Sequence, residues 1–157
     1  MGRIAGGVRA IKLEADDEVV AMELVEKNQE LLVVTENGYG KRTPAKEYKI
    51  QVRGGKGILT YDKAKFKKTG ALIGAMVVDE DDEVLMINSN GVIIRIRAEE
   101  VSKLGRATQG VKIMKVEEGT KIVSMAKVIK EDEAEEAKPA KKAKAEPKEE
   151  TDEQLSL

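Results

Sequence analysis

The stretch TENGYGKRTPAKEYKIQVRGGKGI, residues 35–58, decides how this chain folds. It contains two turn signals, the Asn37-Gly38 pair and the glycine-rich run at 54–57. Strand-forming residues precede the Asn-Gly pair, and an Asn-Gly pair between two strands is typical of a hairpin with a type I′ turn. We therefore expect residues 31–35 and 39–43 to be the two arms of a β-hairpin.

This hairpin signal repeats along the chain, together with a second motif. LVVTENGYGKR at 32–42 aligns without gaps to LMINSNGVIIR at 85–95, so a second hairpin with arms at 84–88 and 92–97 is expected. The other motif is Arg-x-x-x-Gly-Val/Ile, and its copies begin at Arg3, Arg53 and Arg106. Two motifs that keep one period of 50 to 53 residues indicate tandem structural units.

Each unit of about 50 residues consists of short strand-forming runs, and no sustained helical period is visible before residue 130. The runs 8–13 and 19–24, rich in Val, Ile and Leu, are also predicted strands. A four-stranded unit of this length that must stack on its neighbours is typical of a propeller blade. The predicted fold is all-β and propeller-like, with roughly two and a half units near 3–52, 53–105 and 106–129. The last half unit is expected to complete the preceding blade, and the chain is expected to start inside a longer protein.

The charge of the chain is divided between a basic body and an acidic tail. The formal net charge is −1, but residues 1–129 contain more bases than acids and residues 130–157 contain more acids than bases. The tail consists mostly of Ala, Lys, Glu and Pro, which cannot bury a core. We expect 130–157 to be a disordered charged tail, and a basic body suits a nucleic-acid partner.

The composition excludes several classes of site. There is no cysteine and no histidine, which excludes disulfides, zinc sites built on Cys or His, and the usual Cys or His catalytic pairs. No carboxylate pair is placed for acid–base chemistry, so no catalytic residue, metal site or cofactor is predicted. No apolar run approaches the roughly 18 residues of a membrane span, and a cytoplasmic location is expected.

Positive charge is concentrated in and around the same central stretch. Between residues 41 and 68 there are ten basic residues and two acidic ones. A glycine-rich turn with cationic side chains suits phosphate, because the main chain and the charges approach it together. The candidate DNA contacts, which include basic residues on the second arm of each hairpin, are Lys41, Arg42, Lys46, Lys49, Gln51, Arg53, Gly54, Gly55, Lys56, Gly57, Arg95, Arg97 and Arg106.

Structural interpretations of these residues remain open at this point. The turn at 51–57 is equally consistent with an exposed β-turn that carries solvated charges. The arm residues are consistent with ordinary solubility charge on an exposed strand. The arginines that open each Arg-x-x-x-Gly motif are also consistent with ties between adjacent blades.

The motifs resemble a known family. TENGYGKRTPAKEY at 35–48, QVRGGKGI at 51–58 and GRATQGVKIMKV at 105–116 are similar to the C-terminal domain of the DNA gyrase A protein, and the resemblance covers residues 1 to about 129. It implies a β-pinwheel, a propeller-like array that exchanges strands between blades. The family's hallmark motif is Gln-Arg-Arg-Gly-Gly-Lys-Gly; residues 51–57 match it except that Val52 stands in place of the first arginine.

The resemblance also implies a function and partners. The domain would bind and wrap double-stranded DNA without sequence preference and support ATP-dependent negative supercoiling by the whole enzyme. The partners would be DNA, the rest of the gyrase A polypeptide and the ATPase polypeptide, gyrase B, in a heterotetramer. The family's catalytic tyrosine lies in another region, so the chain would be no enzyme on its own. The alternatives are the related domain of topoisomerase IV and a propeller-type protein-interaction scaffold. A scaffold would need apolar or aromatic anchor residues at its surface, and the aromatic content of 3% argues against it.

Overall fold

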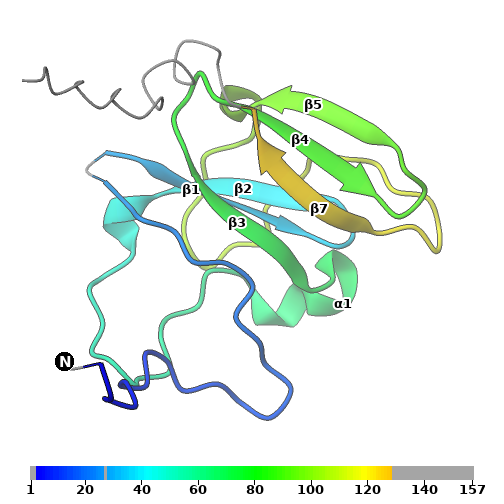
Figure 1. Cartoon of the computed structure of the whole chain (residues 1–157). Helices are drawn as coiled ribbons and strands as arrows, with labels where there is room; N and C mark the ends of the chain where they lie inside the picture. The colour runs from blue at the N-terminus through cyan, green and yellow to red at the C-terminus, as the bar shows by residue number, and fades with distance from the viewer. Residues whose placement is uncertain (1–2, 27, 129–157) are drawn as a thin grey trace, which may run out of the picture.

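Short antiparallel strands dominate the computed structural model, which describes residues 3–26 and 28–128 (Figure 1). The strands are β1 (Glu30–Thr35), β2 (Tyr39–Pro44), β3 (Leu72–Val78), β4 (Glu83–Asn88), β5 (Ile93–Arg97), β6 (Val111–Lys112) and β7 (Ile122–Lys127). The helical elements are single turns: η1 (Ala45–Glu47), η2 (Lys63–Lys65), α1 (Phe66–Thr69) and η3 (Ala98–Glu100).

The strands form two sheets, each built around one of the two expected hairpins. The first sheet has the order β3-β1-β2-β6 and the second the order β5-β4-β7. The last half unit supplies a strand to each sheet, since β6 pairs with β2 and β7 pairs with β4. The prediction that this half unit completes the preceding blade is therefore confirmed for β7. The pairing of β6 also shows that one blade takes strands from three successive units.

The hairpin turns differ from the type I′ turns that the Asn-Gly pairs suggest. In each loop the glycine N–H donates to the carbonyl three residues before it at 3.0 Å, from Gly38 to Thr35 and from Gly91 to Asn88. Both glycines have positive φ, near 80°, whereas the preceding asparagines do not. The loops therefore have three residues and fit a type I turn followed by a left-handed glycine, the usual form for this loop length.

The two strands predicted near the N-terminus are wrong. The run 8–13 makes one isolated bridge, between Ile11 and Gly55, and the run 19–24 makes none. In the repeat, the segment 18–22 corresponds to 121–125, of which residues 122–125 lie in β7. In the second sheet β7 pairs with the free side of β4, the first arm of its hairpin. The corresponding position beside β1 is already occupied by β3, so the segment 18–22 has no strand edge to pair with. Its apolar side chains therefore stay exposed, and Met22 is 93% exposed.

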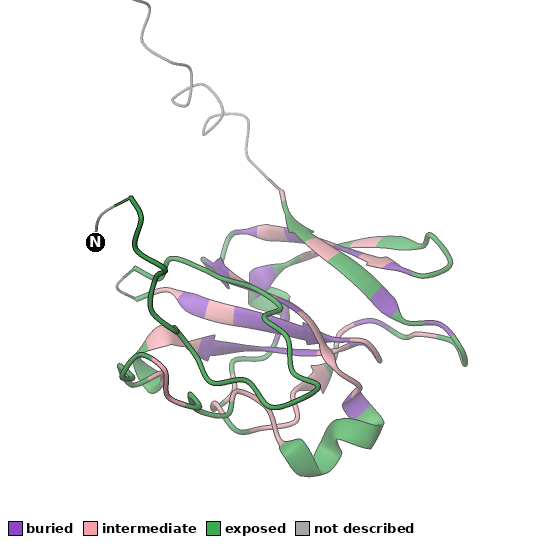
Figure 2. Ribbon diagram, turned by 60° about the horizontal axis from the view of Figure 1, so that its bottom comes forward, coloured by how far each residue is buried: buried purple, intermediate pink, exposed green. Residues whose placement is uncertain are grey.

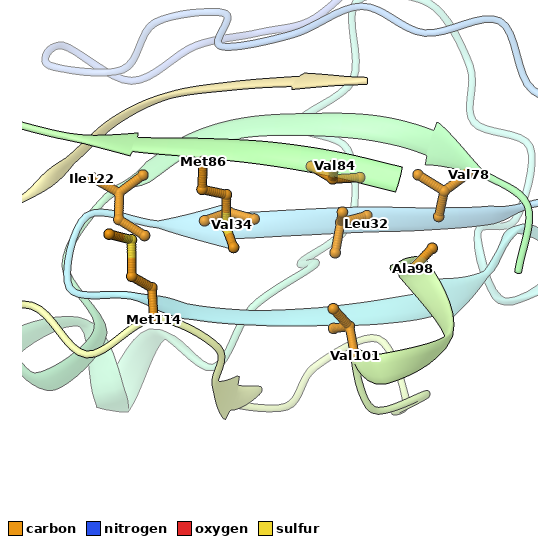
Figure 3. Packing of buried hydrophobic residues seen from close by; sticks show 9 residues of the cluster. All are labelled: Leu32, Val34, Val78, Val84, Met86, Ala98, Val101, Met114 and Ile122. Atoms are coloured by element: carbon orange, nitrogen blue, oxygen red, sulfur yellow. The ribbon is translucent and has the colours of Figure 1, made fainter. Parts of the chain in front are cut away.

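One hydrophobic core joins the two sheets. Figure 3 shows Leu32 and Val34 of β1 facing Val84 and Met86 of β4. The rest of the cluster is Val78, Ala98, Val101, Met114 and Ile122. Burial of each large apolar side chain stabilises the fold by about 1.5–3 kcal/mol. The core fixes the loops that carry the basic residues, because each loop begins or ends at a strand that contributes to it.

Candidate nucleic-acid interface

The box turn, residues 51–57, presents its side chains to solvent. Gln51, Arg53 and Lys56 are exposed, and neither cation has a salt bridge or hydrogen bond within the described residues 3–26 and 28–128. The main chain of the turn is instead engaged. The Gly54 N–H donates to the Ala10 carbonyl at 2.8 Å, and the Gly55 N–H donates to the Val52 carbonyl at 3.4 Å. These two amides are not presented to a ligand, so the box turn offers chiefly cationic side chains.

The other predicted residues near the box turn differ in their exposure to solvent and in their contacts. Lys46 and Lys49 are exposed and, like the box cations, have no ion partner in the part of the chain that is described. Arg106 is half-buried, and its guanidinium donates to the Leu59 carbonyl. Its main-chain N–H donates to the Glu47 carboxylate at 2.9 Å. Arg106 thus ties the third Arg motif to the loop after the box turn, as the structural interpretation expected.

Lys41 does not lie on an outward-facing arm, and that prediction is wrong. Its side chain is fully buried. The ammonium donates to the carbonyls of Gly105 and Arg106 and lies 3.3 Å from the Thr108 hydroxyl. It also lies 5.3 Å from the centre of the Tyr61 ring. Lys41 therefore holds the third Arg motif against the first sheet and has no charge available for a phosphate.

Burial shifts the pKa values of Lys41 and Tyr61. Removal of water from the ammonium lowers the pKa of Lys41 to about 8. Burial likewise raises the pKa of Tyr61 to about 12. Both shifts disfavour the charged form, as expected when water is withdrawn from an ionisable group.

Arg42 is also buried, so its predicted surface role is wrong. Its guanidinium pairs with Glu30 at 2.7 Å, and these two side chains are 5% and 10% exposed. It further donates to the carbonyls of Val101, at 2.9 Å, and Glu99, at 3.2 Å. This residue joins β2 to the segment after β5 and is almost entirely shielded from solvent.

Arg95 is the counterpart of Arg42 in the repeat, 53 residues later, and Glu83 is the counterpart of Glu30. The pair forms again, with the Arg95 Nε donating to the Glu83 carboxylate at 2.9 Å. Here the side chains are 59% and 29% exposed, because no described segment covers that face. Arg97 pairs with Glu99 at 3.2 Å. Both arginines lie at the surface, but a carboxylate already balances each.

A second cationic group, which we call the lysine surface, contains four lysines that were counted among the basic residues of 41–68 but were not predicted as DNA contacts. It consists of the exposed residues Lys63, Lys65, Lys67, Lys68 and Lys112. The ammoniums of Lys68 and Lys112 lie 5.5 and 5.7 Å from the centre of the Tyr39 ring. Figure 2 shows α1 exposed except at its end, where Thr69 is buried. The signal was present in the sequence, since no acid occurs from 63 to 78, but Lys112 joins the group only through the pairing of β6 with β2.

Two other kinds of feature were searched for in the described part of the chain, metal-holding groups and membrane-spanning helices. Residues 3–26 and 28–128 contain no group of three or more His, Cys, Asp or Glu side chains that could hold a metal ion. No helix there is long and apolar enough to cross a membrane. The predicted disorder of 130–157 lies outside the described residues.

Comparison with known proteins identifies the family. The family model described as DNA gyrase C-terminal domain, beta-propeller, matches residues 1–26, 29–79 and 82–129. The DNA gyrase A protein of Mycolicibacterium smegmatis is 44% identical over 138 residues, which is 87% of this chain and 16% of that protein. The DNA gyrase A protein of Staphylococcus epidermidis is 42% identical over 135 residues, 85% of this chain and 15% of that protein. The chain thus spans about a sixth of the length of these relatives.

Solved structures agree on the fold. A structure of a DNA gyrase A C-terminal domain has a TM-score of 0.61 and 35% identity, covering 65% of this chain and 34% of that chain. A C-terminal domain of DNA topoisomerase IV has a TM-score of 0.71 but 21% identity, over 78% of this chain and 38% of that chain, which shows a shared fold only. The predicted all-β pinwheel is confirmed, and the chain belongs to the DNA gyrase C-terminal domain family.

Proposed function

We propose that this chain binds and wraps double-stranded DNA without sequence preference, as the C-terminal part of a DNA gyrase A protein. The observation that carries the proposal is the set of exposed cations without a carboxylate partner at and around the box turn: Lys46, Lys49, Arg53 and Lys56. Such charges bind the phosphate backbone, which is the same for every sequence. Membership of the gyrase family supports this assignment.

In the whole enzyme this wrapping would support ATP-dependent negative supercoiling. The chain would act with the rest of the gyrase A polypeptide and the ATPase polypeptide, gyrase B, in a heterotetramer, and it would carry no catalytic residue or cofactor of its own. DNA bent around a cationic surface is held through its backbone and its deformability, without contacts to base edges. The 44% identity to a gyrase A protein favours gyrase over topoisomerase IV.

Binding to duplex DNA at several salt concentrations tests the first part of this proposal. The logarithm of the association constant should fall linearly with the logarithm of the salt concentration, with a slope of about −0.9 for each phosphate contacted. Two duplexes of unrelated sequence should give the same affinity. An affinity that does not respond to salt, or that differs tenfold between the two sequences, would contradict the proposal.

Wrapping is tested separately from binding. A closed circular plasmid is relaxed by a topoisomerase in the presence of the chain, and its linking number is then measured. Wrapped DNA should leave a changed linking number that scales with the amount of chain added. An unchanged linking number at concentrations that saturate the DNA would mean that the chain binds DNA without wrapping it.

A further inference from the structure

The two Asn-Gly turns share a local conformation but differ in how far water reaches them. In the β4–β5 turn Asn90 and Gly91 are both exposed, whereas in the β1–β2 turn Asn37 is half-buried and Gly38 is buried. In each turn the glycine has positive φ, and its N–H donates to the carbonyl three residues earlier. The dipeptide and its backbone are therefore matched, and a difference in reactivity must come from the surroundings.

An Asn-Gly pair can react with itself, and the only other reactant is water. The main-chain nitrogen of the glycine attacks the side-chain carbonyl carbon of the asparagine and forms a C–N bond that closes a cyclic imide. The bond from that carbon to the side-chain nitrogen breaks, and this nitrogen leaves as ammonia with the proton of the glycine N–H. Water then opens the imide to aspartate or, at the other carbonyl, to isoaspartate. Glycine favours the attack because it has no Cβ and its backbone turns freely.

The turn at Asn37 is held by neighbouring segments through both of its reacting residues. The Asn37 main-chain N–H donates to the Thr69 carbonyl at 3.1 Å, and its side-chain amide donates to the Lys68 carbonyl at 3.0 Å. The Gly38 carbonyl accepts from the Met114 N–H at 3.2 Å. A Cβ at Gly38 would overlap the Met114 carbonyl, so this glycine is packed closely as well. Cyclisation turns the asparagine and the glycine relative to each other and must break these contacts.

The reacting residues of the turn at Asn90 have fewer ties to the rest of the protein. The turn as a whole is docked, since the Ser89 N–H donates to the Lys121 carbonyl at 2.8 Å. The Asn90 side-chain amide donates to the Thr120 hydroxyl at 3.0 Å, while its main-chain N–H donates within the turn. Within the described residues 3–26 and 28–128, a Cβ at Gly91 would meet nothing within 4 Å. The glycine that must approach Asn90 therefore has room to move.

We propose that the Asn90-Gly91 peptide is a site of spontaneous deamidation, and that the fold protects the same dipeptide at Asn37-Gly38. A hydrogen bond of ordinary strength that must break before the reaction slows it by about fivefold. Such bonds to neighbouring segments are more numerous at Asn37 and Gly38 than at Asn90 and Gly91. The inference does not depend on DNA binding.

Deamidation changes the charge of the β4–β5 turn and, for isoaspartate, the length of its main chain. Residues 88–92 contain neither an acid nor a base, so the new carboxylate gives the turn its first charge. Isoaspartate also adds one carbon to the main chain before Gly91, whose N–H donates to the Asn88 carbonyl at 3.0 Å. We expect the isoaspartate form to lose this hydrogen bond and the aspartate form to keep it.

Incubation of the full chain at neutral and at mildly alkaline pH, followed by peptide mapping with mass spectrometry, tests the site. Incubation in heavy-oxygen water labels the product, because opening of the imide takes one oxygen atom from water. In the folded chain the Asn90 peptide should convert at least about fivefold faster than the Asn37 peptide. Its rate should rise with pH, because the Gly91 N–H loses its proton in the attack. In urea the two peptides should convert at comparable rates, since the dipeptide is the same.

Two variants test the contacts and the chemistry. Thr120→Val removes the acceptor of the Asn90 amide, and should raise the rate at Asn90 by about fivefold while the rate at Asn37 stays the same. The Asn37 peptide of the same molecule thus reports whether the variant is folded. Gly91→Ala places a Cβ beside the attacking nitrogen and should suppress conversion at Asn90. Unchanged conversion in this variant would contradict the route through the imide.

The comparison within the unmodified chain decides the matter. Equal rates at Asn90 and Asn37 in the folded chain, or a faster rate at Asn37, would overturn the inference. An Asn90 peptide that stays unmodified in the folded chain, over the time in which both peptides convert in urea, would overturn it too. These results leave the proposed function untouched, because that function is tested by binding to DNA.

Discussion

At the scale of single residues, the same arginine–glutamate pair occurs in two environments. Arg42 and Glu30 are buried between the two sheets, whereas Arg95 and Glu83, 53 residues later, are partly exposed. A buried charge that loses its partner is costly, while a solvated pair contributes little. The chain therefore contains its own control for the effect of burial on an ion pair.

The first prediction concerns this pair. Arg42→Met should lower the free energy of unfolding by about 3 kcal/mol, because it leaves the Glu30 carboxylate buried with Lys103 as its remaining cation. Arg95→Met should change it by less than about 1 kcal/mol. Unfolding in urea measures both. Equal losses in the two variants would show that the difference in burial has no energetic consequence.

The second prediction concerns Lys41 and pH. Burial lowers the pKa of Lys41 to about 8 from its ordinary 10.5, so between these values the unfolded chain holds a proton that the folded chain has released. The free energy of unfolding contributed by Lys41 must therefore rise as the pH rises from 8 toward 10. Above 10 the opposite contribution of Tyr61 begins, because its pKa is raised to about 12.

Urea unfolding of the unmodified chain and of Lys41→Met at pH 7.5 and 9.5 isolates this contribution. The difference between the two proteins should shift in favour of the unmodified chain at the higher pH, since every other titrating group cancels. A difference that stays constant would mean that the Lys41 ammonium is as well solvated in the folded chain as in the unfolded one.

At the scale of elements, the two hairpin turns share a conformation but differ in their surroundings. Gly38 and Gly91 both have φ near 80°. A Cβ on Gly38 would collide with the Met114 carbonyl, whereas a Cβ on Gly91 would meet nothing within 4 Å. Both turns require a positive φ at the glycine. Only Gly38 must also lack a Cβ for steric reasons, because the segment around Met114 packs against it.

We therefore expect Gly91→Ala to cost about 1 kcal/mol from backbone strain alone, and Gly38→Ala to cost at least twice as much. Thermal or urea unfolding of the two variants measures the difference. Equal costs would indicate that the segment around Met114 moves aside without loss.

The same turns show what sequence patterns can and cannot predict. The Asn-Gly pairs and the strand-forming runs beside them correctly predict both hairpins, because these are local signals. The turn type was wrong, since the glycine alone adopts positive φ. The burial of Lys41 and Arg42 was also missed, because the main-chain carbonyls that accept from them lie about 60 residues further along the chain. No local pattern distinguishes a lysine that meets such acceptors from one that meets solvent.

At the scale of the whole molecule, the two sheets depend on one C-terminal segment. The segment after residue 105 supplies β6 to the first sheet and β7 to the second, and it adds Met114 and Ile122 to the core. Together with Gly105 it also supplies the carbonyls that accept from Lys41. The repeat predicted the period of this architecture, but strand exchange between units is visible only in the pairing.

A chain shortened to residues 1–105 tests this dependence. Both sheets would lose an edge strand and the core would lose two of its buried side chains, so we expect no cooperative unfolding transition. Circular dichroism during a urea titration measures it, with the chain shortened to 1–129 as the control. A transition of undiminished cooperativity in the shorter chain would contradict the interdependence of the two sheets.

The pairing of β6 with β2 also sets the order of events during synthesis. Tyr39 pairs with Lys112, so the first blade cannot close until the ribosome has produced more than 70 further residues. Loop closure over such separations slows folding. Until then the edge of β2 is unpaired and the Lys41 ammonium lacks the carbonyls of Gly105 and Arg106. A nascent chain that pauses within this window exposes an unpaired strand edge to its neighbours.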